Sequence, residues 1–317
     1  MAVITVAGAS SEIARIIIAK ILATGRHQVR GLTTRDVDEV DSDGIQWKFA
    51  DYDNTSALVP LLRGSDAVFC FFSSASGYDI AFERQKNLID ASIESGVRRF
   101  APTEFGCKNY SGIPFYEFKT RVREYLEAVN KDRKVLEYSL FQTGFFTNEF
   151  CHPHKSPAVF HPLQMFIDFA NRHAIRVGDG NDPFTLTTVE DLAKVIVEAI
   201  DFPGEWPAVG GIRGATVTTN ELIELGKSLR GSAFQVHDAF ATDISEGHLL
   251  TEWCPTMEHS HFSKEQVQEL SRLATTNFLK GVLNGAWDVS DEWNQLLPHL
   301  KLTDAKEYLS AVWRSKP

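Results

Sequence analysis

Short apolar runs alternate with amphipathic segments through the first half of the chain. Runs rich in Val, Ile, Leu and Phe predict strands at residues 3–8, 27–33, 45–50, 66–72, 97–102 and 136–142. Between them, the spacing of apolar residues predicts helices near 11–24, 54–63, 80–95 and 115–130. One run, "AVFCFF", is apolar throughout, as expected of a strand covered on both faces. This alternation predicts an α/β fold with a doubly wound parallel sheet and right-handed crossovers.

The pattern changes after about residue 150. Residues 148–164, "NEFCHPHKSPAVFHPLQ", are rich in Pro and His and predict irregular structure. Residues 184–200 then predict the end of a strand and a helix capped near Thr188, packed back on the sheet. We therefore expect a nucleotide-binding Rossmann domain and a smaller α+β lobe for the substrate. The Rossmann domain is expected to comprise residues 1–150 and about 185–205, and the substrate lobe residues 151–184 and 206–317.

Composition narrows the class of protein. The 317 residues are 43% hydrophobic with a formal net charge of −10, which argues against nucleic acid as a partner because phosphate binding needs a basic face. No apolar stretch is long enough for a membrane span, and no basic run suggests a membrane surface. The 4 cysteines are widely spaced and are expected to be reduced thiols. We expect a cytoplasmic monomer or homodimer that acts on a small molecule.

The first strand is followed by "GASSEIA", residues 8–14, where nucleotide-binding folds place a glycine-rich turn. Gly8 supplies the tight turn, and Ala14 allows close packing of helix on strand. Ser11 replaces the glycine that lets the backbone approach a pyrophosphate, so the loop either binds a dinucleotide more weakly or keeps the fold without it. A hydroxyl at Ser11 is also able to donate to a phosphate. The candidate cofactor-binding residues of the loop are Gly8, Ser10, Ser11, Glu12 and Ile13.

The end of the second predicted strand bears on the choice of nucleotide. It reads "RGLTTRDVDE", with no acid at the strand end to bind a ribose 2′-hydroxyl and with Arg35 just beyond it. An arginine there favours the 2′-phosphate of NADP over NAD. The alternative is a solvated cation paired with Asp36 or Asp38.

Other catalytic patterns are absent from the sequence. None of the 7 tyrosines has a lysine four residues on, so the Tyr–Lys pair of ordinary short-chain dehydrogenases is missing. The pairs His152/His154 and His259/His261 lack a carboxylate at ligand spacing, and we expect no metal.

Three segments carry a family resemblance: "GVRRFAPTEFG" (96–106), "FYEFKTRVREYLEA" (115–128) and "FQTGFFTNEF" (141–150). They resemble the isoflavone reductase and phenylcoumaran benzylic ether reductase group, which belongs to the NmrA-like atypical short-chain dehydrogenases. The C-terminal stretch 293–313 is similar, more loosely, to fungal NmrA-like members. The resemblance implies a Rossmann domain that binds NADPH and a smaller lobe that closes over the substrate.

The resemblance also implies roles for particular residues. It implies that Lys119 is the catalytic lysine and that Ser73 and Ser74 line the nicotinamide region. It also implies that Thr103, Glu104 and Phe105 lie at the entrance of the substrate site. Thr103 is counted among the cofactor contacts as well. Without the resemblance, the favoured interpretation of Lys119 is a surface lysine that pairs with an acidic neighbour such as Glu117. The remaining candidates for substrate contact, each with core packing or a loop position as the alternative, are Tyr116, Phe145, Phe146 and His152.

These observations predict an NADPH-dependent reductase of a small, mostly apolar metabolite, aromatic or polyketide-like, with Lys119 as proton donor. Two alternatives stay open. One is an NmrA-type regulator that senses nucleotide without turnover. The other is a redox-inert isomerase, dehydratase or cyclase on the same scaffold.

Overall fold

The central sheet confirms the predicted α/β class. The computed structural model describes residues 1–35, 44–74, 77–110, 113–154, 160–231, 233–257, 263–314 and 316. Its largest sheet is parallel throughout and has the strand order β3-β2-β1-β4-β5-β6. These strands are β1 (Val3–Ala7), β2 (Gln28–Thr33), β3 (Ile45–Phe49), β4 (Ala67–Cys70), β5 (Arg99–Ala101) and β6 (Glu137–Tyr138).

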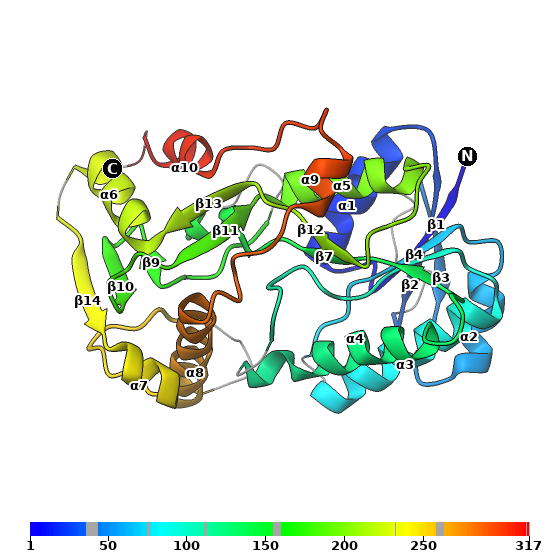
Figure 1. Ribbon diagram of the computed structural model, residues 1–317, viewed down its shortest axis with the longest axis horizontal. Helices are drawn as coiled ribbons and strands as arrows, with labels where there is room; N and C mark the ends of the chain where they lie inside the picture. Colours follow the sequence, from blue (N-terminus) through cyan, green and yellow to red (C-terminus); the bar gives the residue numbers. More distant parts are fainter. Residues whose placement is uncertain are drawn as a thin grey trace.

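Helices cover both faces of this sheet (Figure 1). One face is covered by α1 (Glu12–Ala23) and α5 (Val189–Asp201), which pack against each other. The opposite face is covered by α2 (Thr55–Leu62), α3 (Tyr78–Glu94) and α4 (Glu117–Val129). A sheet enclosed on both faces explains why β4 is buried at every position.

Helix α1 shows how the local sequence produces this packing. Its buried residues Ala14, Ile17, Ile18 and Ile21 recur at helical spacing and form one stripe against the sheet. The helix begins after Ser11, whose Oγ accepts the Ala14 N–H at 3.4 Å as an N-cap.

The predicted strand 136–142 divides into two strands. β6 continues the large sheet beside β5, and β7 (Leu140–Gln142) pairs with β12 (Val209–Gly211). The change of partner occurs at Ser139, whose N–H donates to Phe100 O while the next N–H, of Leu140, donates to Ala208 O. Only Ser139 separates the two strands in the sequence, so periodicity alone gives no sign of this switch.

The second half of the chain forms a lobe of small sheets and helices (Figure 1). Two three-stranded sheets have the orders β14-β10-β9 and β13-β11-β8. Their strands are β8 (Phe145–Phe146), β9 (Ile167–Asp168), β10 (His173–Val177), β11 (Pro183–Thr187), β13 (Ala215–Thr218) and β14 (Gln235–Ala239). The remaining helical segments that the structure describes are η2 (Pro114–Tyr116), η3 (Thr147–Cys151), α6 (Thr219–Arg230), α7 (Ala241–Glu246), α8 (Lys264–Leu283), α9 (Glu292–Leu296) and α10 (Ala305–Trp313).

The chain crosses between the two halves more than once. β7 and β8 precede residue 150 but pair with strands from the second half, whereas α5 returns from the second half to pack on α1. The domain boundaries given above stay a prediction. Within the described residues, no helix has the length and apolarity that crossing a membrane requires.

We predict that Gly8→Ala destabilises the fold more than Gly25→Ala. Both glycines have left-handed backbone, with φ of 71° and 64°, and each substitution should cost about 1 kcal/mol for that conformation. A Cβ at Gly8 would also lie 2.6 Å from Phe71 O, whereas one at Gly25 meets no atom within 4 Å. Urea unfolding should show an extra loss of at least about 1 kcal/mol for Gly8→Ala. Equal losses would mean that the backbone at Phe71, just after β4, moves aside for the added Cβ without a cost in stability.

Candidate active site

Two cavities open where the parallel strands end. The first, of about 340 Å³, is called the loop cavity and follows the ends of β1, β2 and β4. It is lined by Gly8, Ser10, Ser11, Thr33, Thr34, Arg35, Tyr52, Phe71, Phe72, Ser73, Ile80, Ala81 and Arg84. The second, of about 380 Å³, is called the lysine cavity. It is lined by Ile13, Thr103, Glu104, Phe105, Tyr116, Lys119, Gly144, Phe145, Phe146, Glu149, Phe160, His161, Leu163, Met165, Phe278 and Trp287.

The loop cavity is built around the turn at Gly8. The Gly8 N–H donates to the Tyr52 hydroxyl at 3.1 Å, and this hydroxyl donates to Leu32 O at 3.1 Å. Tyr52 therefore ties the turn after β1 to the end of β2. Burial, the largest cause, raises the pKa of Tyr52 well above its ordinary value, so its hydroxyl keeps its proton. The sequence analysis missed Tyr52 because nothing in its local pattern indicates this contact.

Ser11 has a structural reason to replace glycine. Its side-chain oxygen caps α1, a role that glycine fills less well. The cap uses the oxygen as an acceptor and leaves the hydroxyl proton available to a ligand. The first turn of α1 also brings the positive end of the helix dipole to the cavity.

Two arginines line the loop cavity. Arg35 follows β2 as the sequence predicted and is exposed. Arg84 comes from α3 and makes a bidentate ion pair with Asp53 at 2.9 and 2.8 Å. Arg84 was missed because it lies far along the chain from Gly8. Its only sequence signal is that Ile80, Ala81 and Arg84 share a helix face.

This arrangement fits a dinucleotide. The strand order reverses between β1 and β4, the place where open α/β sheets bind nucleotides. A tight glycine turn, a helix N-terminus and two guanidinium groups together suit a ligand with several phosphates. Gly8, Ser10, Ser11, Arg35 and Ser73, five of the predicted cofactor-binding residues, line this one cavity.

Lys119 is buried in the second cavity, which excludes the alternative of a surface lysine. Its side chain is on the first turn of α4 and is 7% exposed. Nζ donates to Glu104 O at 2.7 Å and lies 4.4 Å from the centre of the Tyr116 ring. Burial lowers the pKa of Lys119 to about 8, because desolvation outweighs the opposing charge of Glu104.

Glu104 connects several residues around Lys119 through hydrogen bonds. Its carboxylate accepts hydrogen bonds from Arg123 and, at 2.8 Å, from the Tyr110 hydroxyl. Arg123 also donates to Cys107 O at 2.9 Å and Lys108 O at 2.8 Å. Glu104 is 1% exposed, and a carboxylate so buried is costly to the fold unless it has such partners. Glu104 therefore acts as a structural anchor, and its backbone oxygen positions Lys119.

Of the 16 residues that line the lysine cavity, 7 are Phe, Tyr or Trp. Phe145 stacks on Trp287 with ring centres 3.8 Å apart, and Phe146 meets Phe160 edge to face. Phe145 and Phe146 thus line the cavity and are also buried in the core. Tyr116 is half-buried and lines the same cavity.

A stacked aromatic pair separates the two cavities. Phe71 lines the loop cavity and Phe105 lines the lysine cavity, with ring centres 4.7 Å apart and an angle of 2° between planes. Phe105 has a φ of 38°, a backbone conformation uncommon for residues other than glycine. The stack is therefore the point at which a ligand of one cavity would meet a ligand of the other. Phe71 was missed because it reads as part of the buried strand.

Several residues that the sequence predicts for the cofactor or the substrate do not line the expected cavity. Ile13 and Thr103 line the lysine cavity, and Thr103 Oγ1 accepts the Phe72 N–H at 2.7 Å. Glu12 turns its carboxylate to His161, whose backbone N–H donates to it at 3.1 Å and whose ring also bonds to it. The lining residues of the two cavities do not include Ser74 or His152.

The described residues were also compared with what a metal site or a reactive thiol requires. No group of three or more His, Cys, Asp or Glu suited to a metal occurs among the described residues. The alternatives at Asp36, Asp38, His259 and His261 lie outside those residues. Burial raises the pKa of Cys70, Cys107 and Cys151 to about 12, so these thiols are unreactive.

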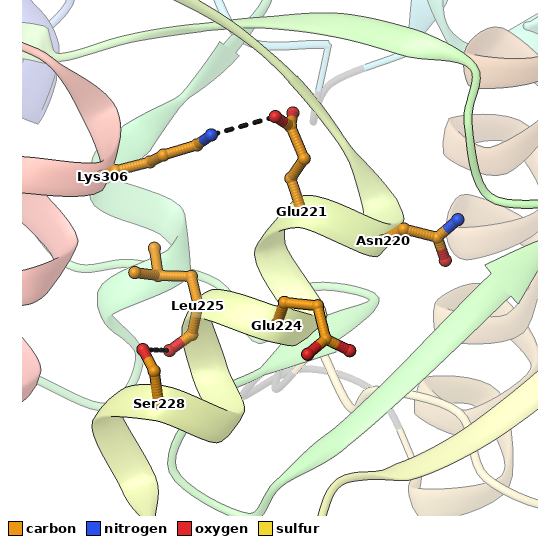
Figure 2. A pocket seen from close by; sticks show the side chains of 6 residues that line it. All are labelled: Asn220, Glu221, Glu224, Leu225, Ser228 and Lys306. Atoms are coloured by element: carbon orange, nitrogen blue, oxygen red, sulfur yellow. Dashed lines mark hydrogen bonds and ion pairs between the residues drawn. The ribbon is translucent and has the colours of Figure 1, made fainter.

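A third hollow lies on the lobe between α6 and α10 (Figure 2). Glu221 and Lys306 form an exposed ion pair at 2.9 Å across it. Its other lining residues are Asn220, Glu224, Leu225 and Ser228, which bring no catalytic group.

Comparisons with known proteins agree with this geometry. The model of the NmrA-like family matches residues 1–309. The oxidoreductase swnN of Metarhizium robertsii is 23% identical over 100% of this chain and 98% of its own length. Phenylcoumaran benzylic ether reductase 1 of Arabidopsis thaliana is 25% identical over 61% of this chain and 60% of its own.

Solved structures share the fold. AtPrR2 with NADP+ and (+)pinoresinol has a TM-score of 0.71 at 19% identity, with 98% of both chains covered. An isoflavone reductase has a TM-score of 0.67 at 20% identity, covering 97% of this chain and 98% of the other. The predicted resemblance, the Rossmann-type fold and the expectation of an oxidoreductase are confirmed by these matches.

We predict that Arg123→Met lowers the free energy of unfolding by about 3 kcal/mol or more, because it leaves the buried Glu104 carboxylate without its cation. Arg121→Met is the matched control on the same helix. Arg121 pairs with Asp79, which is 89% exposed, so its loss should cost less than about 1 kcal/mol. Urea unfolding of both variants measures the difference. Similar losses would show that Glu104 is not the anchor.

Proposed function

The chain belongs to the NmrA-like family, and on this premise we propose that it is an NADPH-dependent reductase of a small, mostly apolar metabolite, aromatic or polyketide-like. One observation carries the proposal. A buried lysine with a pKa near neutrality opens into an aromatic cavity, next to a second cavity built for a dinucleotide.

NADPH, when bound, supplies a hydride to the substrate. The residues of the chain then have two tasks, which are to hold the substrate against the cofactor and to provide a proton. Aromatic walls such as Phe145 and Trp287 bind an apolar ring and keep water out. The partition formed by Phe71 and Phe105 is where the two ligands would come together.

Lys119 is the proton donor in this proposal. Its ammonium gives a proton to the substrate oxygen or carbon that becomes anionic, and the neutral amine takes one back from water. A pKa of about 8 suits both steps at neutral pH. The backbone oxygen of Glu104 and the face of Tyr116 hold Nζ in place without neutralising it.

Arg35 and Arg84 bind the phosphates in the loop cavity. Arg84 is already paired with Asp53, whereas Arg35 follows β2, where the adenosine ribose lies in this kind of fold. We therefore assign the 2′-phosphate of NADPH to Arg35. This assignment favours NADPH over NADH.

We predict that Lys119→Met lowers turnover by about two to four powers of ten, with NADPH binding nearly unchanged. Turnover is measured as NADPH oxidation against a panel of aromatic ketones and enones. In the unmutated protein the rate should fall as pH rises through about 8, because the ammonium is lost. Lys119→Arg should not restore turnover, since guanidinium keeps its proton.

Lys131→Met, an exposed lysine just after α4, is the control and should behave as the unmutated protein. Full turnover in Lys119→Met would refute the role of Lys119. Binding of NADPH without oxidation of any panel member would favour the nucleotide-sensing regulator. If calorimetry detects neither NADPH nor NADH at millimolar concentration, the redox-inert enzyme becomes the better proposal.

We predict that Arg35→Ala weakens NADPH binding by about 1 to 3 kcal/mol and leaves NADH binding nearly unchanged. Isothermal titration calorimetry with both nucleotides measures this. Arg84→Ala is the comparison and should not show the same preference. A loss specific to NADPH in Arg84→Ala alone would move the 2′-phosphate to Arg84.

A further inference from the structure

Glu149 is a carboxyl group in the lysine cavity that the proposed reaction does not use. It is on η3 and lines the cavity together with Lys119 of α4. Its Oε2 accepts the Leu163 N–H at 2.5 Å. Among the described residues it forms no ion pair, and its pKa shows no effect of a neighbouring cation.

The neighbours of Glu149 on η3 are fixed by their own contacts. The Asn148 side chain accepts the Val189 N–H at 2.9 Å and donates to Glu190 and Tyr308, which ties η3 to α5 and α10. On the other side, Phe150 O accepts the indole N–H of Trp313 at 3.1 Å. Glu149 is thus held at the cavity by a backbone anchored on both sides.

The surroundings favour the neutral acid. Burial, and then the negative charge of Glu12, raises the pKa of Glu149 to about 8, although the Leu163 N–H opposes this. The titratable groups around it come from several elements: Glu12 of α1, Tyr116 of η2, Lys119 of α4, Cys151 of η3 itself and His161. The His161 ring is bonded to Glu12, and the Lys119 ammonium is bonded to Glu104 O, so neither of these side chains is paired with Glu149.

We propose that Glu149 is a protonated carboxylic acid that donates a hydrogen bond to a neutral acceptor on the substrate, such as a carbonyl or ether oxygen. It therefore selects, among apolar molecules that fit the aromatic walls, those that carry such an oxygen. The proposal rests on the proposed function only in taking the lysine cavity as the substrate site.

The opposite possibility is a cationic substrate held by an ionised Glu149. The ammonium of Lys119 lines the same cavity and would repel a second cation. A carboxylate at Glu149 would also lie unpaired near the Glu12 charge. A neutral acceptor avoids both costs.

The protonation state can be measured on the full chain without nucleotide or substrate. Infrared difference spectra between about pH 6 and about pH 10 should show a protonated carboxyl band that is lost with a midpoint near pH 8. Glu149→Gln should remove this band. Glu224→Gln, the same change at an exposed site (Figure 2), should keep it. Absence of the band in the unmutated protein, or its survival in Glu149→Gln, would overturn the proposal.

Binding of two probes of equal shape tests the hydrogen bond. Acetophenone carries a carbonyl where α-methylstyrene carries a methylene group, and both are titrated by NMR into the nucleotide-free protein. We expect the unmutated protein to prefer acetophenone about fivefold to tenfold. This preference should fade as pH rises through about 8, because the carboxylate has no proton to donate.

Glu149→Gln keeps an N–H donor and should retain the preference at all pH values, whereas Glu149→Leu should abolish it. Equal binding of both probes by the unmutated protein, or loss of the preference in Glu149→Gln, would overturn the proposal. If Glu149→Leu fails to fold, the proposal is still tested by comparing how the preference for acetophenone changes with pH in the unmutated protein and in Glu149→Gln. A protein that oxidises no NADPH would contradict the proposed reductase and leave these binding results intact.

Discussion

The buried carboxylate of Glu104 is the point on which the geometry of the lysine cavity depends. It lies after β5, and through Arg123 and Tyr110 it joins the segment 104–110 to α4. Isolated, such a charge would be strongly unfavourable in this interior, so the three groups must fold together. Because Lys119 is bonded to the backbone oxygen of the same residue, its ammonium is held in one place by the network. A flexible lysine would instead reach out to water and keep its ordinary pKa.

A second constraint joins the loop at residues 8–14 to the lobe. The sequence puts Glu12 in the first turn of α1, where a carboxylate suits the helix dipole but opposes an anionic ligand. The structure resolves this conflict by directing the carboxylate to His161, away from the loop cavity. His161 and Ile13 also line the lysine cavity, so both cavities share the start of α1. The stack of Phe71 on Phe105 is a further shared boundary. A shift of the first turn of α1 would therefore change the shape of both cavities.

The sequence predicts the sheet well because period and apolarity depend on local chain direction and burial. The strands of the large sheet and the helices around them lie within a few residues of their predicted ranges. The division at Ser139 escaped prediction because it depends on Ala208, which is distant in sequence. Of the site, Gly8 and Arg35 followed from their positions after predicted strands, and Lys119 required the family resemblance. Glu149 was not singled out, since its partial burial and its lack of a paired cation emerge only when η3, α1 and the segment around Leu163 meet.

Burial acts on Lys119 and Glu149 in opposite directions and brings both to the same pH range. Desolvation disfavours the charged form of each group, so it lowers the pKa of the lysine and raises that of the acid, to about 8 in both. Below this pH both groups hold a proton, so the Lys119 ammonium is charged and the Glu149 carboxyl is neutral. Above it both protons are lost, and the charge of the pair changes from positive to negative. A cavity walled by aromatic rings thus offers two proton donors at neutral pH with one charge between them, and that charge rests over the face of Tyr116. In the proposed reaction, these properties favour a mostly apolar molecule that carries polar atoms able to accept hydrogen bonds.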